Sequence, residues 1–383
     1  MIKTVKIKNF KSIIEETVKL PDFGAVVGLN GAGKSNLIQA IDVVRSLILG
    51  ADIETVQMKM STIPNELFNL KDKNSSKPFS IEVELENVNQ EIFSFKIGIS
   101  KNQNQKQELS LIVSEEIFCK KIENKFEKIY SRDEKGSIYQ NNGELMPFVM
   151  PEDKLFATVY DHEDLEACRE LFKETRIHHF DGASLRTPRF VIVGGARIDQ
   201  LSRLISKIMK NESLYKDFIK ILKGLMPNFS DFKEINFEGE KIKGEPRREL
   251  LLLLQEESLQ SDLTTRAMSE GDARTLFIVA TALDMARDST LIIEELENGM
   301  HPERISKLFD HLDTFSKVKN MQVVFTTHSP IVINKLGAER VLFVEKDGDG
   351  SHFTLLRESE DISKIKDLLK DGGRLSDYLS RKI

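Results

Sequence analysis

The stretch Gly28-Leu-Asn-Gly-Ala-Gly-Lys-Ser35 decides the fold. It matches the phosphate-loop pattern, in which a glycine, four free positions and a second glycine precede Lys and then Ser or Thr. The run Gly24–Gly28 is short and continuously apolar, as in a strand that is buried on both faces. From Ser35 onward, apolar residues recur three and four apart, as in an amphipathic helix. We therefore predict a strand, a glycine-rich turn and a helix over residues 24–49.

This loop has the chemistry of an anion site. Glycines let consecutive backbone N–H groups turn toward one anion, and the helix that follows adds the positive end of its dipole. Lys34 is expected to reach the β- and γ-phosphates of a nucleotide, and the Ser35 hydroxyl is expected to bind Mg²⁺. The position between a strand and a helix favours this interpretation over an ordinary glycine turn. The predicted nucleotide-binding residues are Asn30, Gly31, Ala32, Gly33, Lys34, Ser35 and Asn36.

A second group of residues follows the apolar strand expected at Leu291–Ile293. Glu294 and Glu295 come directly after it. In a phosphate-loop fold, the first acid holds Mg²⁺ through its water shell, and the next is placed to polarise an attacking water. We assign Glu294 to the metal and Glu295 to the general base. Strands also commonly end in solvated acids, which is the alternative.

Two further segments, one around His328 and one around Ser269, each have both a structural and a functional interpretation. The strand expected at Val323–Phe325 leads to His328, which is either a surface residue or a hydrogen-bond donor to a γ-phosphate. Ser269 opens a helix expected at 272–286 and is a good N-cap residue. The same helix start is suited to a γ-phosphate contact through Ser269 and the Gly271 N–H. One serine can fill both roles in different states.

Composition narrows the class of protein. The chain has 383 residues, with 55 basic and 61 acidic side chains and a formal charge of −6. That length permits two domains, and the charge argues against a broadly basic nucleic-acid coat. Two cysteines cannot form a disulfide framework or a four-thiolate zinc site. The N-terminus lacks a signal-peptide core and no apolar run is long enough for a membrane span, so we expect a cytoplasmic protein without membrane contact.

The rest of the chain indicates a mixed α/β protein. Alternating segments within residues 79–140 predict antiparallel hairpins, and residues 155–225 have helical spacing. Residues 200–248 contain 11 basic and 7 acidic side chains, a local net charge of +4. Such a basic helix face is either simply solvated or a patch for nucleic acid or an acidic partner.

In this order, the motifs resemble the ABC-type ATPase heads of the SMC, RecF and OLD (overcoming-lysogenization-defect) group. The residues that occupy the motif positions look most like those of bacterial OLD-like AAA ATPases. The resemblance rests on Asn9–Ile13, Gly33–Asn36, Ile293–Pro302 and Thr326–Pro330. It implies an α/β P-loop NTPase that binds ATP and Mg²⁺ and hydrolyses ATP, with an antiparallel β subdomain. The implied parts are a first lobe at 1–155, a mainly helical insert at 156–248 and a second lobe at 249–383.

The resemblance also implies partners. Two heads would enclose two ATPs in a homodimer or a higher oligomer, with Ser269 and Gly271 reaching the partner's nucleotide. Relatives often act in anti-phage defence beside an effector such as a nuclease, which we expect to be a separate polypeptide. DNA repair of the RecF or SMC type, a transporter ATPase subunit and a scaffold that hardly turns over remain alternatives. The chain departs from the general pattern in having Glu294 in place of Asp and Leu296 in place of Pro.

Overall fold

The computed structural model describes residues 1–60, 64–69, 77–103, 109–179, 191–193, 196–198, 200–242, 245–256, 262–264 and 267–382. The chain forms two compact units, one of Met1–Ile177, Asp288–Ile293 and Met321–Ile383, the other of His178–Arg287 and Glu294–Asn320. These units cut across the expected boundaries at 155 and 248. The reason is that four strands from late in the chain, within residues 290–355, belong to a sheet of the first unit.

The phosphate loop follows a strand of a six-stranded sheet. The strand order is β10-β16-β17-β3-β18-β19, and β16, β17, β3 and β18 pair in parallel. Every residue of β3 and β17 is buried, as their apolar sequences predict. The strands are β10 (Thr175–His178), β16 (Thr290–Ile293), β17 (Gln322–Thr326), β3 (Phe23–Gly28), β18 (Val341–Asp347) and β19 (Gly350–Leu355). The strands predicted at 24–28, 291–293 and 323–325 are confirmed.

An antiparallel sheet of eight strands makes up much of the rest of the first unit. Its order is β2-β1-β4-β5-β6-β7-β8-β9. In β4 the burial alternates strictly between buried and half-buried residues, so the period-two pattern at 79–85 identified the strand correctly. The bounds are β2 (Ile13–Lys19), β1 (Ile2–Phe10), β4 (Phe79–Glu86), β5 (Ile92–Gln103), β6 (Leu109–Ile122), β7 (Lys125–Arg132), β8 (Ser137–Gln140) and β9 (Leu145–Val149).

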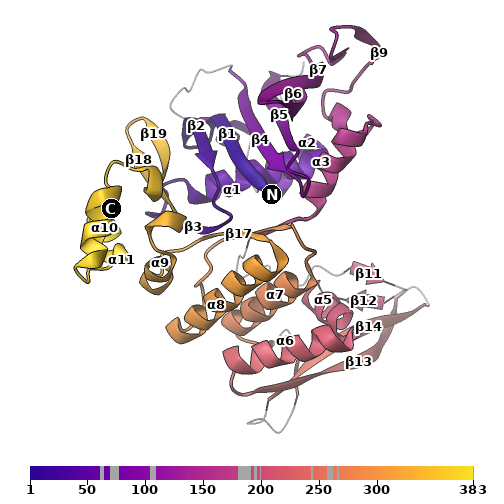
Figure 1. The fold of residues 1–383 in the computed structure, drawn as a ribbon. Helices are drawn as coiled ribbons and strands as arrows, with labels where there is room; N and C mark the ends of the chain where they lie inside the picture. The colour runs from indigo at the N-terminus through magenta and orange to yellow at the C-terminus, as the bar shows by residue number, and fades with distance from the viewer. Residues whose placement is uncertain are drawn as a thin grey trace. The chain divides into compact units, whose positions relative to one another are not determined.

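Helices cover this sheet and flank the parallel one. Helix α1 packs on β1 and β4, and α3 packs on α1 (Figure 1). The buried side of α1 includes Leu37, Ile41 and Val44, in agreement with the predicted spacing. The helices of this unit are α1 (Lys34–Ile48), α2 (Ile53–Lys59), α3 (Glu163–Lys173), α9 (Pro330–Leu336), α10 (Ile362–Lys370) and α11 (Leu375–Lys382).

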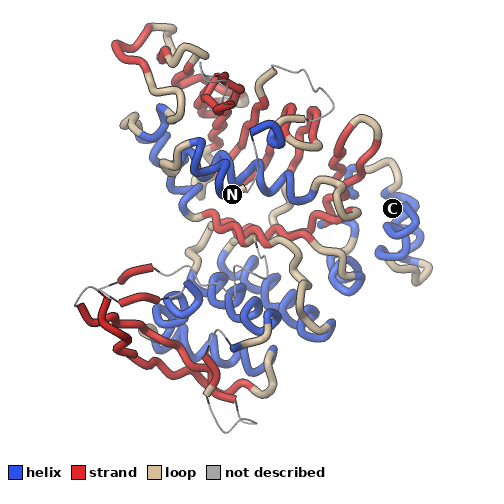
Figure 2. The backbone as a smooth tube through the Cα atoms, turned by 180° about the vertical axis from the view of Figure 1, so that it is seen from behind, coloured by secondary structure: helices blue, strands red, loops and turns tan. Residues whose placement is uncertain are grey.

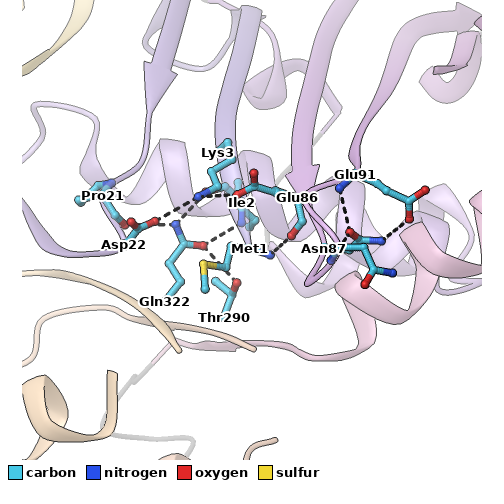
Figure 3. A network of polar contacts seen from close by, with 11 residues as sticks. Met1, Ile2, Lys3, Pro21, Asp22, Glu86, Asn87, Glu91, Thr290 and Gln322 are labelled. Carbon is cyan, nitrogen blue, oxygen red and sulfur yellow. Dashed lines mark hydrogen bonds and ion pairs between the residues drawn. The ribbon is translucent and has the colours of Figure 1, made fainter. Parts of the chain in front are cut away.

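A buried glutamine joins the two sheets of the first unit (Figure 3). The Gln322 amide nitrogen donates to the carbonyl oxygens of Ile2 (2.7 Å) and Pro21 (3.1 Å). Its amide oxygen accepts from the Ile2 N–H (2.8 Å) and the Thr290 hydroxyl (3.1 Å). Because all these groups are buried, each needs a partner. Gln322 therefore holds the start of β17 to β16 and to β1.

The described residues of the second unit form four α-helices and a long hairpin. Helices α7 and α8 pack on each other and on α6, and α5 packs on α6 and α7. Figures 1 and 2 show the β13–β14 hairpin alongside these helices. Its elements are β11 (Val191–Val193), β12 (Ala196–Ile198), α5 (Gln200–Met209), α6 (Glu212–Leu225), β13 (Phe229–Ile242), β14 (Glu245–Glu256), β15 (Leu263–Thr264), α7 (Glu270–Asp284) and α8 (Pro302–Lys319).

The hairpin is a difference from the sequence-based expectation. Residues 156–248 were expected to be mainly helical, but their described part also contains strands, among them β13. The apolar run Leu250–Leu254 lies in β14, which pairs with β13. A short apolar run does not by itself distinguish a strand from a buried helix. No helix in the described part of the chain has the length and apolar character that a membrane span needs.

Candidate functional site

The phosphate loop leaves β3 and enters α1 through two left-handed residues. Gly31 has φ = 77° and Gly33 has φ = 117°. Residues with a Cβ atom rarely adopt these backbone conformations, which explains why glycine occupies both positions. Gly33 is also the N-cap of α1 and provides no side-chain cap. The first N–H groups of a helix lack intrahelical acceptors, so this helix start is suited to an anion.

Lys34 is the charged centre of the loop. Its side chain is buried, and its Nζ donates to the carbonyl oxygens of Gly28 (2.9 Å) and Leu29 (2.8 Å). The ammonium group therefore lies against the loop itself. Among its neighbours, Asn30, Gly31 and Ser35 are exposed, whereas Ala32 is buried. This arrangement leaves the Ser35 hydroxyl at the surface, where it can bind a hydrated cation.

Asn36 connects the phosphate loop to two serines that the sequence analysis did not predict to be part of the site. Its Nδ2 donates to the Ser12 Oγ (2.6 Å), and the Ser12 and Ser351 hydroxyls share a hydrogen bond of 2.6 Å. A Cβ added at Gly33 would lie less than 3.0 Å from the Ser351 Oγ. Gly33 therefore packs on the start of β19. Ser12 belongs to the Asn9–Ile13 stretch, but no local signal marks Ser351.

His328 comes from the strand next to the phosphate loop. Strand β17 pairs with β3 in parallel, with Thr326 opposite Val26. His328 follows two residues later, beyond the end of β17 and so at the carboxyl edge from which the phosphate loop starts. Its side chain is exposed. The turn is held locally, because the Thr327 Oγ1 accepts from the Ser329 N–H at 3.0 Å. The expected role of His328 toward a phosphate stays a prediction.

The two acids follow the last residue of β16 and begin what we call the acid turn, Glu294–Gly299. The Glu294 Oε2 shares a 2.8 Å hydrogen bond with the Nδ1 of His179. Its Oε1 is buried and has no hydrogen-bond partner among the described residues. A buried acceptor needs a donor or a cation. Glu294 thus fits a role beside Mg²⁺ or its bound water, and His179 is a partner that the sequence did not reveal.

Glu295 has different surroundings. It is exposed, and its backbone is left-handed with φ = 48°. Such a conformation costs a non-glycine residue about 1–3 kcal/mol. The Asn298 Nδ2 donates to the Glu295 Oε2 at 3.2 Å, and the Asn298 N–H donates to the Glu295 carbonyl at 3.1 Å. Glu295 is thus an exposed carboxylate on a strained backbone, and the neighbouring Glu294 carboxylate is fixed by a hydrogen bond. This is the arrangement expected of a general base beside a metal-side acid.

Ser269 caps helix α7. Its Oγ accepts from the Asp272 N–H (3.1 Å) and donates to the Asp272 carboxylate (2.5 Å). Asp272 also forms a 2.6 Å ion pair with Arg304 of α8. The capping interpretation is therefore what the structure shows. The contact of Ser269 and Gly271 with a phosphate stays a prediction, and Ser269 is exposed at the helix start.

Arg274 links α7 to the acid turn. Its side chain is fully buried, and its guanidinium donates to the carbonyl oxygens of both Glu294 and Glu295. Burial lowers the pKa of Arg274 to about 10, although the carboxylates of Glu295 and Glu270 raise it. The group therefore remains cationic at neutral pH. Sequence reasoning missed Arg274, because one arginine in an amphipathic helix has no distinctive pattern.

The basic residues of α5 and α6 are exposed. They are Arg203, Lys207, Lys210, Lys216, Lys220 and Lys223. Two of them are partly neutralised, because Lys207 pairs with Asp284 and Lys216 with Glu212, at 2.5 and 2.6 Å. Both side chains of the Lys216–Glu212 pair are exposed, and such a pair contributes little to stability. Both interpretations of this face stay open, and the side chains of residues 235–248 lie outside the described part.

The chain is similar to a described protein family and to a solved structure. The family described as "AAA domain, putative AbiEii toxin, Type IV TA system" matches residues 23–334. Among solved structures, the SMC head domain from Thermotoga maritima is similar. The match has 13% sequence identity and a TM-score of 0.41, and it covers 92% of this chain and 98% of that chain. No curated protein matches the chain. The P-loop α/β fold with an antiparallel sheet is confirmed.

Proposed function

The chain belongs to the family of AAA domains described as the putative AbiEii toxin of type IV TA systems, and on this premise we propose that it binds ATP with Mg²⁺ and hydrolyses the ATP. The observation that carries the proposal is the phosphate loop. A buried strand leads through left-handed Gly33 to buried Lys34 and to a helix start without a side-chain cap. This geometry is suited to a triphosphate.

Each residue has a role in this proposal. Lys34 and the loop N–H groups bind the phosphates, with Asn30, Gly31, Ala32 and Asn36 shaping the loop. Ser35 and Glu294 hold Mg²⁺, which neutralises charge on the β- and γ-phosphate oxygens. Glu295 accepts the proton of the attacking water, and His328 donates a hydrogen bond to the γ-phosphate. The unmatched oxygen of Glu294 supports its assignment to the metal side.

We propose a head-to-head homodimer or a higher oligomer. Ser269 and Gly271 of one subunit would contact the γ-phosphate that is held by the phosphate loop of the other. The exposure of Ser269 at the start of α7 supports this arrangement. In this arrangement the Ser269 hydroxyl would turn its one donor from the Asp272 carboxylate to the phosphate, and its oxygen could still accept from the Asp272 N–H. Hydrolysis would then require two chains.

We further propose that ATP turnover controls a separate effector, such as a nuclease, in anti-phage defence. The support is the description of the family, which names a type IV TA system. A DNA-repair ATPase of the RecF or SMC type is a second candidate, because the exposed cations of α5 and α6 offer a surface to nucleic acid. Affinity purification with and without ATP distinguishes the two, according to whether a protein effector or DNA is retained.

The first test concerns ATP binding. Lys34→Ala removes a charged hydrogen-bond donor, and such a bond contributes about 1.5–3 kcal/mol. We expect calorimetry to show ATP affinity lower by roughly 10-fold to 100-fold or more. Lys317→Ala is the matched control, because Lys317 is 65% exposed and pairs only with Asp313 among the described residues. Equal ATP affinity of Lys34→Ala and Lys317→Ala would refute the proposed site.

A further inference from the structure

A buried arginine connects the start of helix α7 to the two acids. Arg274 lies in the second turn of α7, and its side chain is 0% exposed. Arginine is almost never fully buried unless its charge has partners. Here the partners include two backbone groups, the carbonyl oxygens of Glu294 and Glu295. The guanidinium therefore fixes the path of the chain at both acids.

The backbone of the acid turn requires stabilising contacts of this kind. Glu295 has φ = 48°, a conformation that persists only where its surroundings enforce it. The Glu295 carbonyl accepts from Arg274 and also from the Asn298 N–H at 3.1 Å. The arginine thus adds a hydrogen bond from outside the turn to one from within it. The left-handed backbone aims the exposed Glu295 side chain, so a change in this backbone would move the carboxylate.

A second contact joins the same two pieces. Gly271 lies against the acid turn so closely that an added Cβ would be less than 3.0 Å from the Gly299 carbonyl oxygen. The Gly271 carbonyl accepts from the Thr275 hydroxyl at 2.6 Å. The first two turns of α7 and the acid turn therefore touch at both ends, through Gly271 and through Arg274. A shift of the Ser269 end of α7 would therefore displace the backbone of Glu295.

We propose that Arg274 is a positioning residue for hydrolysis, which holds the backbone of Glu294 and Glu295 to helix α7. This inference rests on the proposed function. The arginine touches no substrate. It sets the direction of the Glu295 carboxylate and couples it to helix α7, whose N-cap residue Ser269 contacts the partner's nucleotide in the proposed dimer. The alternative is that Arg274 only stabilises the fold.

A matched pair of variants separates these roles. Arg132 of β7 is also buried, 2% exposed, and its guanidinium also donates to two backbone carbonyls, those of Pro151 and Lys154. Arg274→Met and Arg132→Met thus remove the same kind of interaction. A displacement of about 1 Å in a catalytic group lowers the rate about 100-fold. For Arg274→Met we expect kcat to fall by about that factor, while the dissociation constant for ATP stays close to the wild-type value.

The measurement is turnover per folded molecule, with ATP affinity measured on the same samples. Arg132→Met should unfold at a lower temperature and keep kcat. If Arg274→Met does not fold, Arg274→Lys decides. It keeps the cation, but its side chain is one bond shorter and ends before the Nη2 position from which Arg274 donates to both carbonyls. Its kcat should therefore lie between those of wild type and Arg274→Met or, in the absence of the latter, below that of wild type. Unchanged kcat in the folded variant, or an equal loss in Arg132→Met, overturns the inference. A wild-type protein that does not hydrolyse ATP overturns the proposed function instead.

Discussion

At the scale of single residues, two adjacent glutamates have different environments. The Glu294 side chain is 16% exposed and shares a hydrogen bond with His179. Glu295 is exposed and sits on a left-handed backbone. A carboxylate that helps to hold a metal benefits from a fixed position. A general base must instead reach water and the substrate. The difference in burial supports the proposed division of labour.

This division predicts the behaviour of two variants. Glu295→Gln keeps the shape and hydrogen bonding of the side chain but removes its basicity. We expect ATP binding to persist and kcat to fall roughly 10²- to 10⁴-fold, which is the usual contribution of a general base. Glu294→Gln should instead raise the Mg²⁺ concentration needed for half-maximal turnover.

The readout is phosphate release over a Mg²⁺ titration, with Glu303→Gln as the control. Glu303 is an exposed residue of α8 that pairs with Lys307, and we expect its variant to behave like wild type. If Glu295→Gln turned over normally while Glu294→Gln bound ATP without hydrolysis, the two roles would have to be exchanged.

At the scale of elements, the β18–β19 hairpin supports the phosphate loop from late in the chain. Ser351 bonds to Ser12 beside Gly33. The next residue, His352, bonds through Nδ1 to Glu16 of β2 (2.9 Å) and through Nε2 to Asp347 of β18 (3.2 Å). Burial lowers the pKa of His352, but these hydrogen bonds and the two carboxylates outweigh it and raise the pKa above the ordinary 6.5.

A raised histidine pKa sets the sign of a pH effect. The folded state binds the proton more tightly than the unfolded state, so the stabilisation is fully present below pH 6.5. It is lost as the pH rises through the pKa of the folded state. The His352 side chain is 44% exposed, so we expect less than about 1 kcal/mol.

The check compares wild type with His352→Gln in denaturant, at one pH well below and one well above the ordinary histidine pKa. The difference in unfolding free energy should be larger in acid. His311 is a control of opposite sign, because burial lowers its pKa. A difference for His352→Gln that grows with pH would contradict the assignment.

At the scale of the whole molecule, the proposed dimer makes each ATP site depend on two chains. Ser269→Arg should block the contact with the partner's nucleotide, and Lys34→Ala should block ATP binding. Each variant alone is then expected to be inactive. In a mixed dimer, one site combines an intact phosphate loop with an intact Ser269.

An equimolar mixture therefore tests action between subunits. Random exchange in a twofold dimer gives mixed dimers in half of the cases, with one complete site each, so roughly a quarter of the wild-type ATPase activity should return. If Ser269 only caps α7, then Ser269→Ala costs about 1 kcal/mol of stability and leaves turnover intact. No recovery in the mixture, when subunit exchange is demonstrated by differently tagged chains, would exclude action in trans.

The sequence by itself determined the elements whose causes are local. The apolar run at 24–28, the glycine spacing and the helical period after Ser35 predict β3, the phosphate loop and α1, because sterics and burial act there over a few residues. The alternation in β4 is of the same kind. The Ser269 cap was also readable, since its acceptor role involves an N–H only three residues away.

Only the tertiary structure decided which distant residues meet. His179 and Glu294 are 115 residues apart, and Ser12 and Ser351 are 339 apart. Arg274 is buried only because α7 packs beside the acid turn, and nothing in its local sequence distinguishes it from a surface arginine. Contacts of this kind depend on how whole elements pack, and packing is set by the sum of many weak interactions across the chain. A local pattern therefore identifies the loop that faces a phosphate, but not the residues that hold its neighbours in place.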